Sequence, residues 1–397
     1  MWHDEPMHHV SDDERRARIG VRHALAAGFH ADSPEAATRA VTALHATEPA
    51  TVYLSCRARV PSLTVADLDR ALYEDRRLVK QLAMRRTLFV FPRELLPAVW
   101  PSASARVAAA ERARMRKDLV REGIADDGDA WLDRARAEVL ALLADEPEGL
   151  VAADVRRAVP GIDVRVTGSA GEVWSAPRVL TLLGAAADIV RGANTGRFAV
   201  SQPRWTLTGH WLDGVPAPWS AAEGYRELVR LWLHSFGPGT EDDIVWWLGS
   251  TKTAVRTALA ELGAVMVSLD GGATGWLLPD DLGRTADPGP WVALLPVLDP
   301  TVMGWRGRDF YLGPHRQQLF DNRGNAGTTA WADGRVVGTW VQDGSGAVRV
   351  HLLEPVSTAT RRALGEEAAR LTEWLDGVRI GTGYVSPAMR AARAAWE

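Results

Sequence analysis

The densest group of chemically active side chains in this sequence is a basic segment from Arg76 to Arg121. It holds twelve Lys and Arg residues against three Asp and Glu residues, a local net charge of about +9. Guanidinium and ammonium groups at this density bind the phosphates of nucleic acid. The whole chain carries a net charge of −4, so any such affinity must be local. All but three of the 46 cationic residues are arginines, and a genome rich in arginine codons is an alternative source of that excess.

Other kinds of chemistry leave no recognisable motif. The sequence contains no Walker loop, dinucleotide fingerprint, paired-cysteine metal motif or nucleophile elbow. His3, His8 and His9 resemble a metal-binding tract, but at a mobile terminus we expect them to be incidental. We therefore predict no metal and no cofactor.

Composition and length indicate a reduced, multi-unit globular protein. The single cysteine, Cys56, cannot form an internal disulfide, and no apolar stretch approaches the roughly 18 to 20 residues that span a bilayer. The first residues lack the basic and apolar regions of a signal peptide. We predict a cytoplasmic protein without membrane contact. Its 397 residues are enough for two to four structural units, and most of its 17 tryptophans are expected in the core.

Helix signals dominate the first part of the chain. Ser11 and Glu14 have capping-box spacing before a helix over residues 12–27, and Ser33-Pro34 starts a second helix whose apolar face reaches Leu44. His45-Ala46-Thr47 is then predicted at the end of that second helix. Further elements are expected in the following order: helices at 51–59 and 64–73, a strand at 88–91 and a basic helix at 97–122. Helices followed by a short strand pair are typical of a winged helix.

The same order recurs twice. Helices are predicted at 131–143, 151–159 and 175–187 with strands at 189–191 and 197–200 around a turn, and then helices at 221–235, 240–248 and 252–262 with strands at 265–268 and 276–278. After Pro288-Gly289-Pro290 the pattern changes to strands at 291–298, 328–331, 336–341 and 348–353, with Asp333-Gly334 as a hairpin turn and a final helix at 357–375.

These elements predict a mainly helical α+β protein with three tandem winged helices and a C-terminal β-rich segment. The expected boundaries are 11–125, 126–215, 216–288 and 289–397. Winged helices bind duplex DNA, although some mediate protein contacts instead. The arginine-rich segment favours DNA.

Six short motifs extend this interpretation. They are Leu44-His45-Ala46-Thr47-Glu48-Pro49 followed by Ala58-Arg59-Val60; Ala83-Met84-Arg85-Arg86-Thr87-Leu88; Ile189-Val190-Arg191-Gly192 with Ser201-Gln202-Pro203-Arg204-Trp205; Phe236-Gly237-Pro238-Gly239-Thr240; Leu295-Pro296-Val297-Leu298-Asp299-Pro300 with Gly304-Trp305-Arg306-Gly307-Arg308; and Asp333-Gly334-Arg335-Val336-Val337-Gly338-Thr339-Trp340. Through them the sequence, from about residue 12 to 390, resembles the AlkZ/YcaQ family of DNA glycosylases, which are built from tandem winged helices.

The resemblance implies a monofunctional DNA glycosylase that excises bulky or crosslinking N7-alkylated purines from double-stranded DNA. Three fused winged helices already supply an extended DNA-binding surface and favour a monomer. Self-protection against a DNA-alkylating natural product is one setting for such an activity. The family's catalytic motif is a glutamine, an apolar residue, and a glutamine or aspartate. Those positions here are His45, Ala46 and Thr47.

Histidine can serve the same chemistry. An N7-alkylated purine is cationic and leaves readily, so the enzyme must hold a water and stabilise positive charge at the sugar. Neutral His45 can accept a hydrogen bond from that water or take its proton, and Thr47 offers a second hydrogen-bonding group. Alternatively, His45 is an ordinary helix-end histidine and Thr47 a local cap. The protein would then bind DNA without cutting it, as a transcription regulator or a lesion binder; winged helices that only scaffold proteins would show no affinity for DNA.

Further DNA contacts are predicted around the wings. The candidate residues are Arg85 and Arg86 near the first wing, Gln202 and Arg204 after the second, and Lys252 and Arg256 on the third recognition helix. A solvated strand edge is the alternative for Arg85 and Arg86. Trp305, if exposed, could stack on the adduct. Asp299 and Arg308 are expected to support the site structurally, by orienting it or anchoring a loop.

Overall fold

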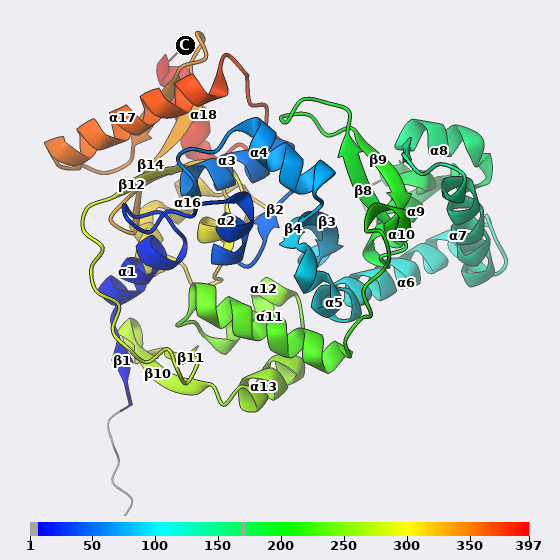
Figure 1. Ribbon diagram of the computed structural model, residues 1–397, viewed down its shortest axis with the longest axis horizontal. Helices are drawn as coiled ribbons and strands as arrows, with labels where there is room; N and C mark the ends of the chain where they lie inside the picture. Colours follow the sequence, from blue (N-terminus) through cyan, green and yellow to red (C-terminus); the bar gives the residue numbers. More distant parts are fainter. Residues whose placement is uncertain (1–6, 169–170, 397) are drawn as a thin grey trace, which may run out of the picture. The chain divides into compact units, whose positions relative to one another are not determined.

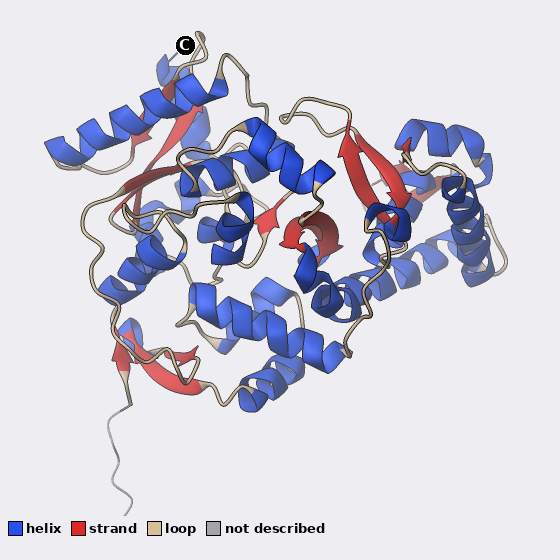
Figure 2. Ribbon diagram, viewed as in Figure 1, coloured by secondary structure: helices blue, strands red, loops and turns tan. Residues whose placement is uncertain are grey.

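The computed structural model describes residues 7–168 and 171–396. By their contacts these residues form two compact units. Unit 1 comprises residues 1–68 and 226–397, and unit 2 comprises residues 69–225; the divisions fall within helices α4 (Val65–Asp69) and α11 (Ala221–Phe236). Helices make up most of the regular structure of both units (Figure 2). The fold is therefore the expected mainly helical α+β type, whereas the division into three winged helices stays a prediction.

The N-terminal segment of unit 1 is mainly helical. Its elements are β1 (His9–Val10), α1 (Asp12–Arg22), α2 (Pro34–Ala40), β2 (Leu44–His45) and α3 (Pro49–Arg59). Ser11 caps α1 by accepting a hydrogen bond from the Glu14 amide at 3.2 Å, as its spacing predicts. The reciprocal half of the box is replaced, because the Glu14 carboxylate pairs with Arg18 at 2.9 Å. Ala24, with a φ of 55°, lies outside the helix, which ends five residues earlier than predicted.

Residues 221–277 have the expected helix, helix, helix, hairpin order. After α11 come α12 (Glu241–Leu248), α13 (Lys252–Glu261), β10 (Val265–Leu269) and β11 (Thr274–Leu277). β1 pairs in parallel with β10, and His9 contacts Ser268 and Asp270 at 3.0 and 3.1 Å. The expectation of a mobile terminus is therefore wrong for His8 and His9, because backbone pairing holds this segment. His3 lies outside the described residues.

A four-stranded antiparallel sheet forms the C-terminal part of unit 1. Its strands run in the order β12 (Val292–Leu295), β13 (Thr329–Ala332), β14 (Arg335–Gln342) and β15 (Val348–Leu352), and α17 (Thr358–Leu375) and α18 (Pro387–Trp396) pack on it (Figure 1). Asp333 and Gly334 have φ values of 49° and 79°, as a two-residue hairpin turn requires. The short helices α14 (Pro300–Met303), α15 (Asp309–Leu312) and α16 (Arg316–Leu319), together with α18, were not predicted.

Unit 2 contains a hairpin and a second helix-and-wing region. Its elements are β3 (Leu78–Ala83), β4 (Thr87–Pro92), α5 (Leu96–Val99), α6 (Ala105–Arg121), α7 (Gly128–Ala144), β5 (Leu150–Val151), α8 (Ala152–Ala158), β6 (Arg165–Gly168), β7 (Gly171–Trp174), α9 (Ser175–Ala185), β8 (Ile189–Asn194), β9 (Pro203–Leu207) and α10 (Thr208–Trp211). Its core includes Met115 of α6, Trp131 of α7, Leu180 of α9 and Trp205 of β9. The strand predicted at 197–200 is wrong, because Asn194 bonds Gln202 and closes residues 195–202 into a loop.

Candidate functional site

The His45–Thr47 segment lies between a short strand and a helix, not at a helix end. Thr42 has a φ of 64°, a left-handed conformation that stops α2 at Ala40 before the apolar pattern ends. The chain then forms β2, which contains His45, and Thr47 lies in a bend before α3. His45 is 6% exposed and Thr47 is exposed. The predicted helix-end position of His45 is therefore wrong. The segment instead holds a buried histidine two residues before an exposed threonine.

Glu48 follows this segment directly and is a residue that the sequence analysis missed. Its Oε1 accepts hydrogen bonds from the Gly383 amide at 3.0 Å and the Thr382 hydroxyl at 3.3 Å. The signal was available, because Glu48 occupies the cap position of α3, where a carboxylate is favoured. The sequence pattern placed Glu48 only between the His45–Thr47 segment and the helix predicted at 51–59.

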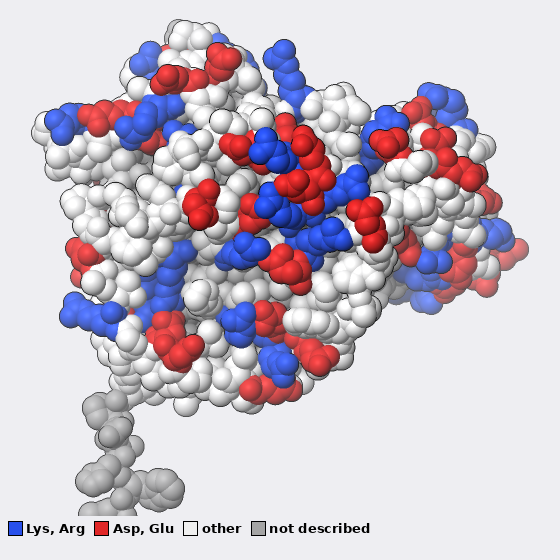
Figure 3. Space-filling model, viewed as in Figure 1, with Lys and Arg blue, Asp and Glu red and all other residues white. Residues whose placement is uncertain are grey.

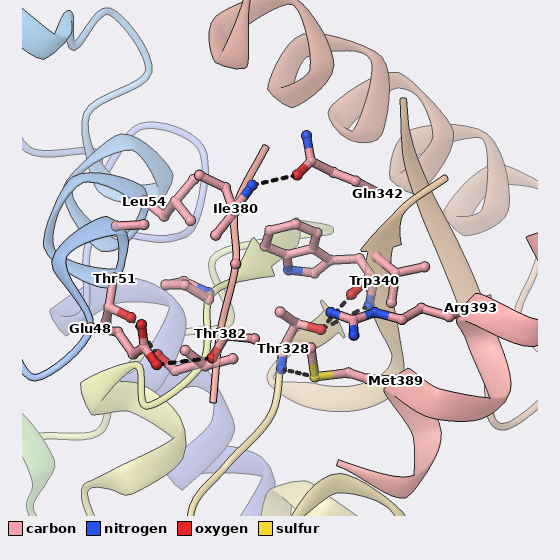
Figure 4. Close-up of a pocket in the computed structure, with 15 residues that line it drawn as sticks. Glu48, Thr51, Leu54, Thr328, Trp340, Gln342, Ile380, Thr382, Met389 and Arg393 are labelled. Carbon is pink, nitrogen blue, oxygen red and sulfur yellow. Dashed lines mark hydrogen bonds between the residues drawn. The ribbon is translucent and has the colours of Figure 1, made fainter. Parts of the chain in front are cut away.

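A pocket of unit 1 begins at Glu48 (Figure 4). Its volume is about 430 Å³, including the open space at its mouth. Thr51 and Leu54 of α3 line one side, Trp340 of β14 and Met389 of α18 line another, and Thr382 joins Glu48 across it. The lining is largely apolar, and its charged members are Glu48 and Arg393. Residues of the sheet, of α3 and α18 and of the loop at 380–384, which we call the strap, therefore meet beside the candidate catalytic segment although they are far apart in sequence.

Asp299 anchors a buried polar network below α3. Both Asp299 and Arg59 are fully buried, and the carboxylate accepts from the Arg59 guanidinium at 2.9 and 3.0 Å. The Ser55 hydroxyl and the Thr301 amide donate to the same carboxylate at 2.6 and 2.9 Å. Burial opposes ionisation of Asp299, but the charge of Arg59 and these hydrogen bonds outweigh burial and hold its pKa below the usual value. This geometry supports the predicted structural role of Asp299 and adds Arg59 as its partner.

Trp305 is not exposed, so it cannot stack on an adduct in this conformation. The side chain is 3% exposed, and its Nε1 donates to the Phe236 carbonyl at 3.0 Å. Its ring packs against His23, Phe236 and Phe310 with centroid distances of 5.9, 5.2 and 5.2 Å. The expectation that Trp305 is exposed is therefore wrong, because residues from three separate segments cover it.

Arg308 is buried as well, at 3% exposure. Its guanidinium lies over the rings of Trp246 and Phe320, at 4.8 and 4.7 Å from their centroids. These contacts fit the predicted anchoring role.

The predicted arginines of the first wing lie at the tip of the β3–β4 hairpin in unit 2. Arg85 and Arg86 have φ values of 54° and 60°, a left-handed conformation that costs a non-glycine residue roughly 1–2 kcal/mol. Arg86 is exposed but its Nε lies 3.1 Å from Glu111, and Arg85 is half-buried. Contact of this tip with DNA remains a prediction.

The charge of the basic segment is largely neutralised in three dimensions. Helix α7 places two carboxylates against α6, so that Arg112 pairs with Asp129 and Asp133 at 2.9 Å each, and Arg116 pairs with Asp129 at 3.2 Å. Arg121 pairs with Asp118 at 3.0 Å. On the face shown in Figure 3, Lys and Arg side chains are interspersed with Asp and Glu. A positive stretch of sequence is therefore not a positive surface here.

The remaining DNA-contact candidates are polar and partly satisfied within the protein. Gln202 is exposed in the loop before β9, whereas Arg204 lies within β9 and donates to the Glu148 carbonyl at 3.0 Å. Lys252 and Arg256 are exposed on α13 and pair with Asp242 and Glu241 of α12 at 2.9 and 2.7 Å. Their role in DNA contact stays a prediction.

Within residues 7–168 and 171–396, no three His, Cys, Asp or Glu side chains gather in a group that could hold a metal ion. Among the same residues, no helix is long and apolar enough to span a bilayer.

Comparison with known proteins assigns the family. The family model described as AlkZ-like DNA glycosylase matches residues 38–374. Among solved structures, the DNA glycosylase AlkZ of Streptomyces sahachiroi superposes with a TM-score of 0.72 at 18% identity, covering 92% of this chain and 97% of that one. At that identity the likeness establishes the fold alone, and comparison with curated proteins gave no match. Since the family model spans most of the sequence, the protein belongs to the AlkZ-like family of DNA glycosylases.

Proposed function

We propose that this protein is a monofunctional glycosylase that hydrolyses the N-glycosidic bond of bulky N7-alkylated purines in double-stranded DNA. The observation that carries the proposal is the position of His45 and Thr47. They occupy the family's two polar motif positions, and Thr47 is exposed in the bend between β2 and α3. Glu48 follows with its carboxylate at the edge of a pocket.

Hydrolysis of this glycosidic bond needs few catalytic groups. The cationic base is already a good leaving group, so catalysis needs a positioned water and stabilisation of an oxocarbenium-like sugar. Neutral His45 accepts a hydrogen bond from the water and takes its proton as the C–O bond forms, while Thr47 fixes the water's second hydrogen bond. The Glu48 carboxylate supplies negative charge toward the developing cation. The products are the free alkylated base and an abasic site.

The test compares four proteins on duplex DNA carrying a single N7-alkylguanine, with abasic sites measured over time. Wild type is expected to exceed spontaneous depurination, and His45→Ala to lose most of that excess. His45→Gln installs the family's own residue and is expected to retain activity, with Thr47→Val reduced. No excess over depurination in the wild type overturns the glycosylase assignment, and full activity of His45→Ala overturns the role of His45.

A non-catalytic DNA-binding protein is the second candidate, and the burial of His45 favours it. A lesion binder would retain the modified duplex without forming abasic sites, and a regulator would prefer one DNA sequence. The same incubation with a crosslinked duplex measures unhooking, which appears as separated strands on a denaturing gel. We further propose a monomer acting in the cytoplasm on chromosomal DNA, in a cell that produces or meets a DNA-alkylating compound.

A further inference from the structure

A second cleft of unit 1 is lined by arginines from three segments. Arg308, Arg316, Arg323 and Arg390 all contribute to it, in a space of about 1890 Å³ that includes open solvent. Asp321 is the carboxylate in this lining, and its oxygens already accept from the Arg323 and Asn325 amides and from the Asn325 side chain, each at 2.9 Å. The lining therefore has an excess of positive charge.

These four arginines differ from Arg112 of α6 and Arg256 of α13. In the part of the chain that the structure describes, no carboxylate lies within ion-pairing distance of any of them, whereas Arg112 and Arg256 pair with acids at 2.9 and 2.7 Å. Arg390 donates instead to the Val385 carbonyl at 2.9 Å. Positive charge that is held in close ion pairs on α6 is therefore less fully balanced here, where Asp321 lies near Arg323 without an ion pair.

Arg308 provides the second, independent sign of a ligand. Its side chain is only 3% exposed, yet it lines both this cleft and a neighbouring one. Its Nη2 lies 4.0 Å from the Met303 sulfur, and its Nε finds no hydrogen-bond partner among the described residues. Burial lowers the pKa of Arg308, and the charge of Asp243 and a hydrogen bond with Tyr311 offset this only in part. An anion in the cleft would therefore stabilise the buried cation.

The cleft adjoins the candidate catalytic segment through one strap of chain. Gly383 and Tyr384 line the cleft, and the Gly383 amide donates to Glu48 at 3.0 Å. Tyr384 lines the cleft, and burial and then the charges of Glu48 and Asp321 raise its pKa. An anion bound in the cleft would therefore contact the same loop, the strap, that bonds Glu48 next to His45 and Thr47.

We propose that this cleft binds a backbone phosphodiester of the DNA strand. The planar donors of Arg308 hold the phosphate oxygens, and Arg316, Arg323 and Arg390 surround them with positive charge. The inference deepens the proposed function by naming a phosphate site that fixes the strand beside Glu48. It rests on the protein's being a DNA-binding glycosylase, but not on the catalytic role of His45.

The test measures binding of an undamaged fluorescent duplex by anisotropy between about 50 and 200 mM salt. Arg316→Gln, Arg323→Gln and Arg390→Gln each remove an exposed charge, and Arg308→Met replaces the buried one. Arg362→Gln is the matched control, because Arg362 is an exposed arginine of α17 in the same unit. The substitution also removes one positive charge, but this charge lies 3.5 Å from the Glu366 carboxylate and is already paired. If Arg308→Met fails to fold, the three exposed variants carry the test.

Each cleft variant is expected to weaken duplex binding about tenfold and to lower the slope of log affinity against log salt by about 0.9, with the control unchanged. Cleft variants that bind like Arg362→Gln overturn the inference. So does stabilisation of the wild type by inorganic phosphate, lost in Arg323→Gln, without any change in duplex affinity, because the cleft would then hold a free anion. Since the duplex is undamaged, failure of this test is separate from failure of base excision.

Discussion

His23 gives the structure a pH dependence that can be calculated. The imidazole is fully buried; its Nε2 donates to the Ser235 carbonyl at 3.1 Å, and its Nδ1 faces the Thr301 hydroxyl at 2.9 Å. Arg59 donates to that same hydroxyl at 2.7 Å, so the hydroxyl proton points to Nδ1 and the ring is held neutral. Burial, reinforced by the charge of Arg59, lowers the pKa of His23 to about 3.

The direction of the effect follows from proton uptake by the unfolded chain. Between pH 6.5 and about 3 the unfolded state binds a proton at His23 that the native state does not. Stability is therefore lost as the pH falls below 6.5, at up to about 1.4 kcal/mol per pH unit. From pH 7.5 to pH 5 this single group removes about 2 kcal/mol from the free energy of unfolding.

The assay is urea unfolding of wild type and His23→Gln at pH 7.5, 6 and 5, followed by circular dichroism and tryptophan fluorescence. The glutamine does not titrate, so the variant, although less stable at pH 7.5, loses about 2 kcal/mol less than wild type on acidification. His234→Gln, at an exposed position of α11, is the control for removing an imidazole. An unchanged stability difference between wild type and His23→Gln from pH 7.5 to 5 would refute the reasoning.

Three further predictions concern the site and its supports. Asp299→Ala leaves the Arg59 guanidinium buried without a counter-charge and should cost about 3–5 kcal/mol in urea unfolding; a loss below about 1 kcal/mol would contradict the network. Glu48→Gln keeps an oxygen for the strap but removes the charge, and should slow single-turnover excision about tenfold with unfolding unchanged; an equal rate excludes an electrostatic role. Thr240→Ala breaks the capping box with Asp243 and should cost about 1 kcal/mol in urea unfolding, whereas no shift in the midpoint argues against this cap.

Local capping and turn signals predicted several elements correctly. Ser11 starts α1, Thr240 starts α12 and Asp333-Gly334 turns β13 into β14, because capping and turn geometry depend on residues a few positions apart. The family motifs also identified the glycosylase family. Helix α18 was missed although Ser386 and Pro387 precede an alanine-rich run, which is a start signal of the same local kind.

By itself the sequence determined the family, the mainly helical class and the segment to examine for catalysis. Tertiary structure alone decided which charges are available and which side chains are buried. The positive charge of Arg112, which looks unpaired in the sequence, is paired with Asp129 of a neighbouring helix. Trp305 is buried against Phe236 and His23. Arg308 and Arg390 became part of one cleft although 82 positions separate them. Electrostatics and burial depend on distance in space, which a local pattern of residues does not specify.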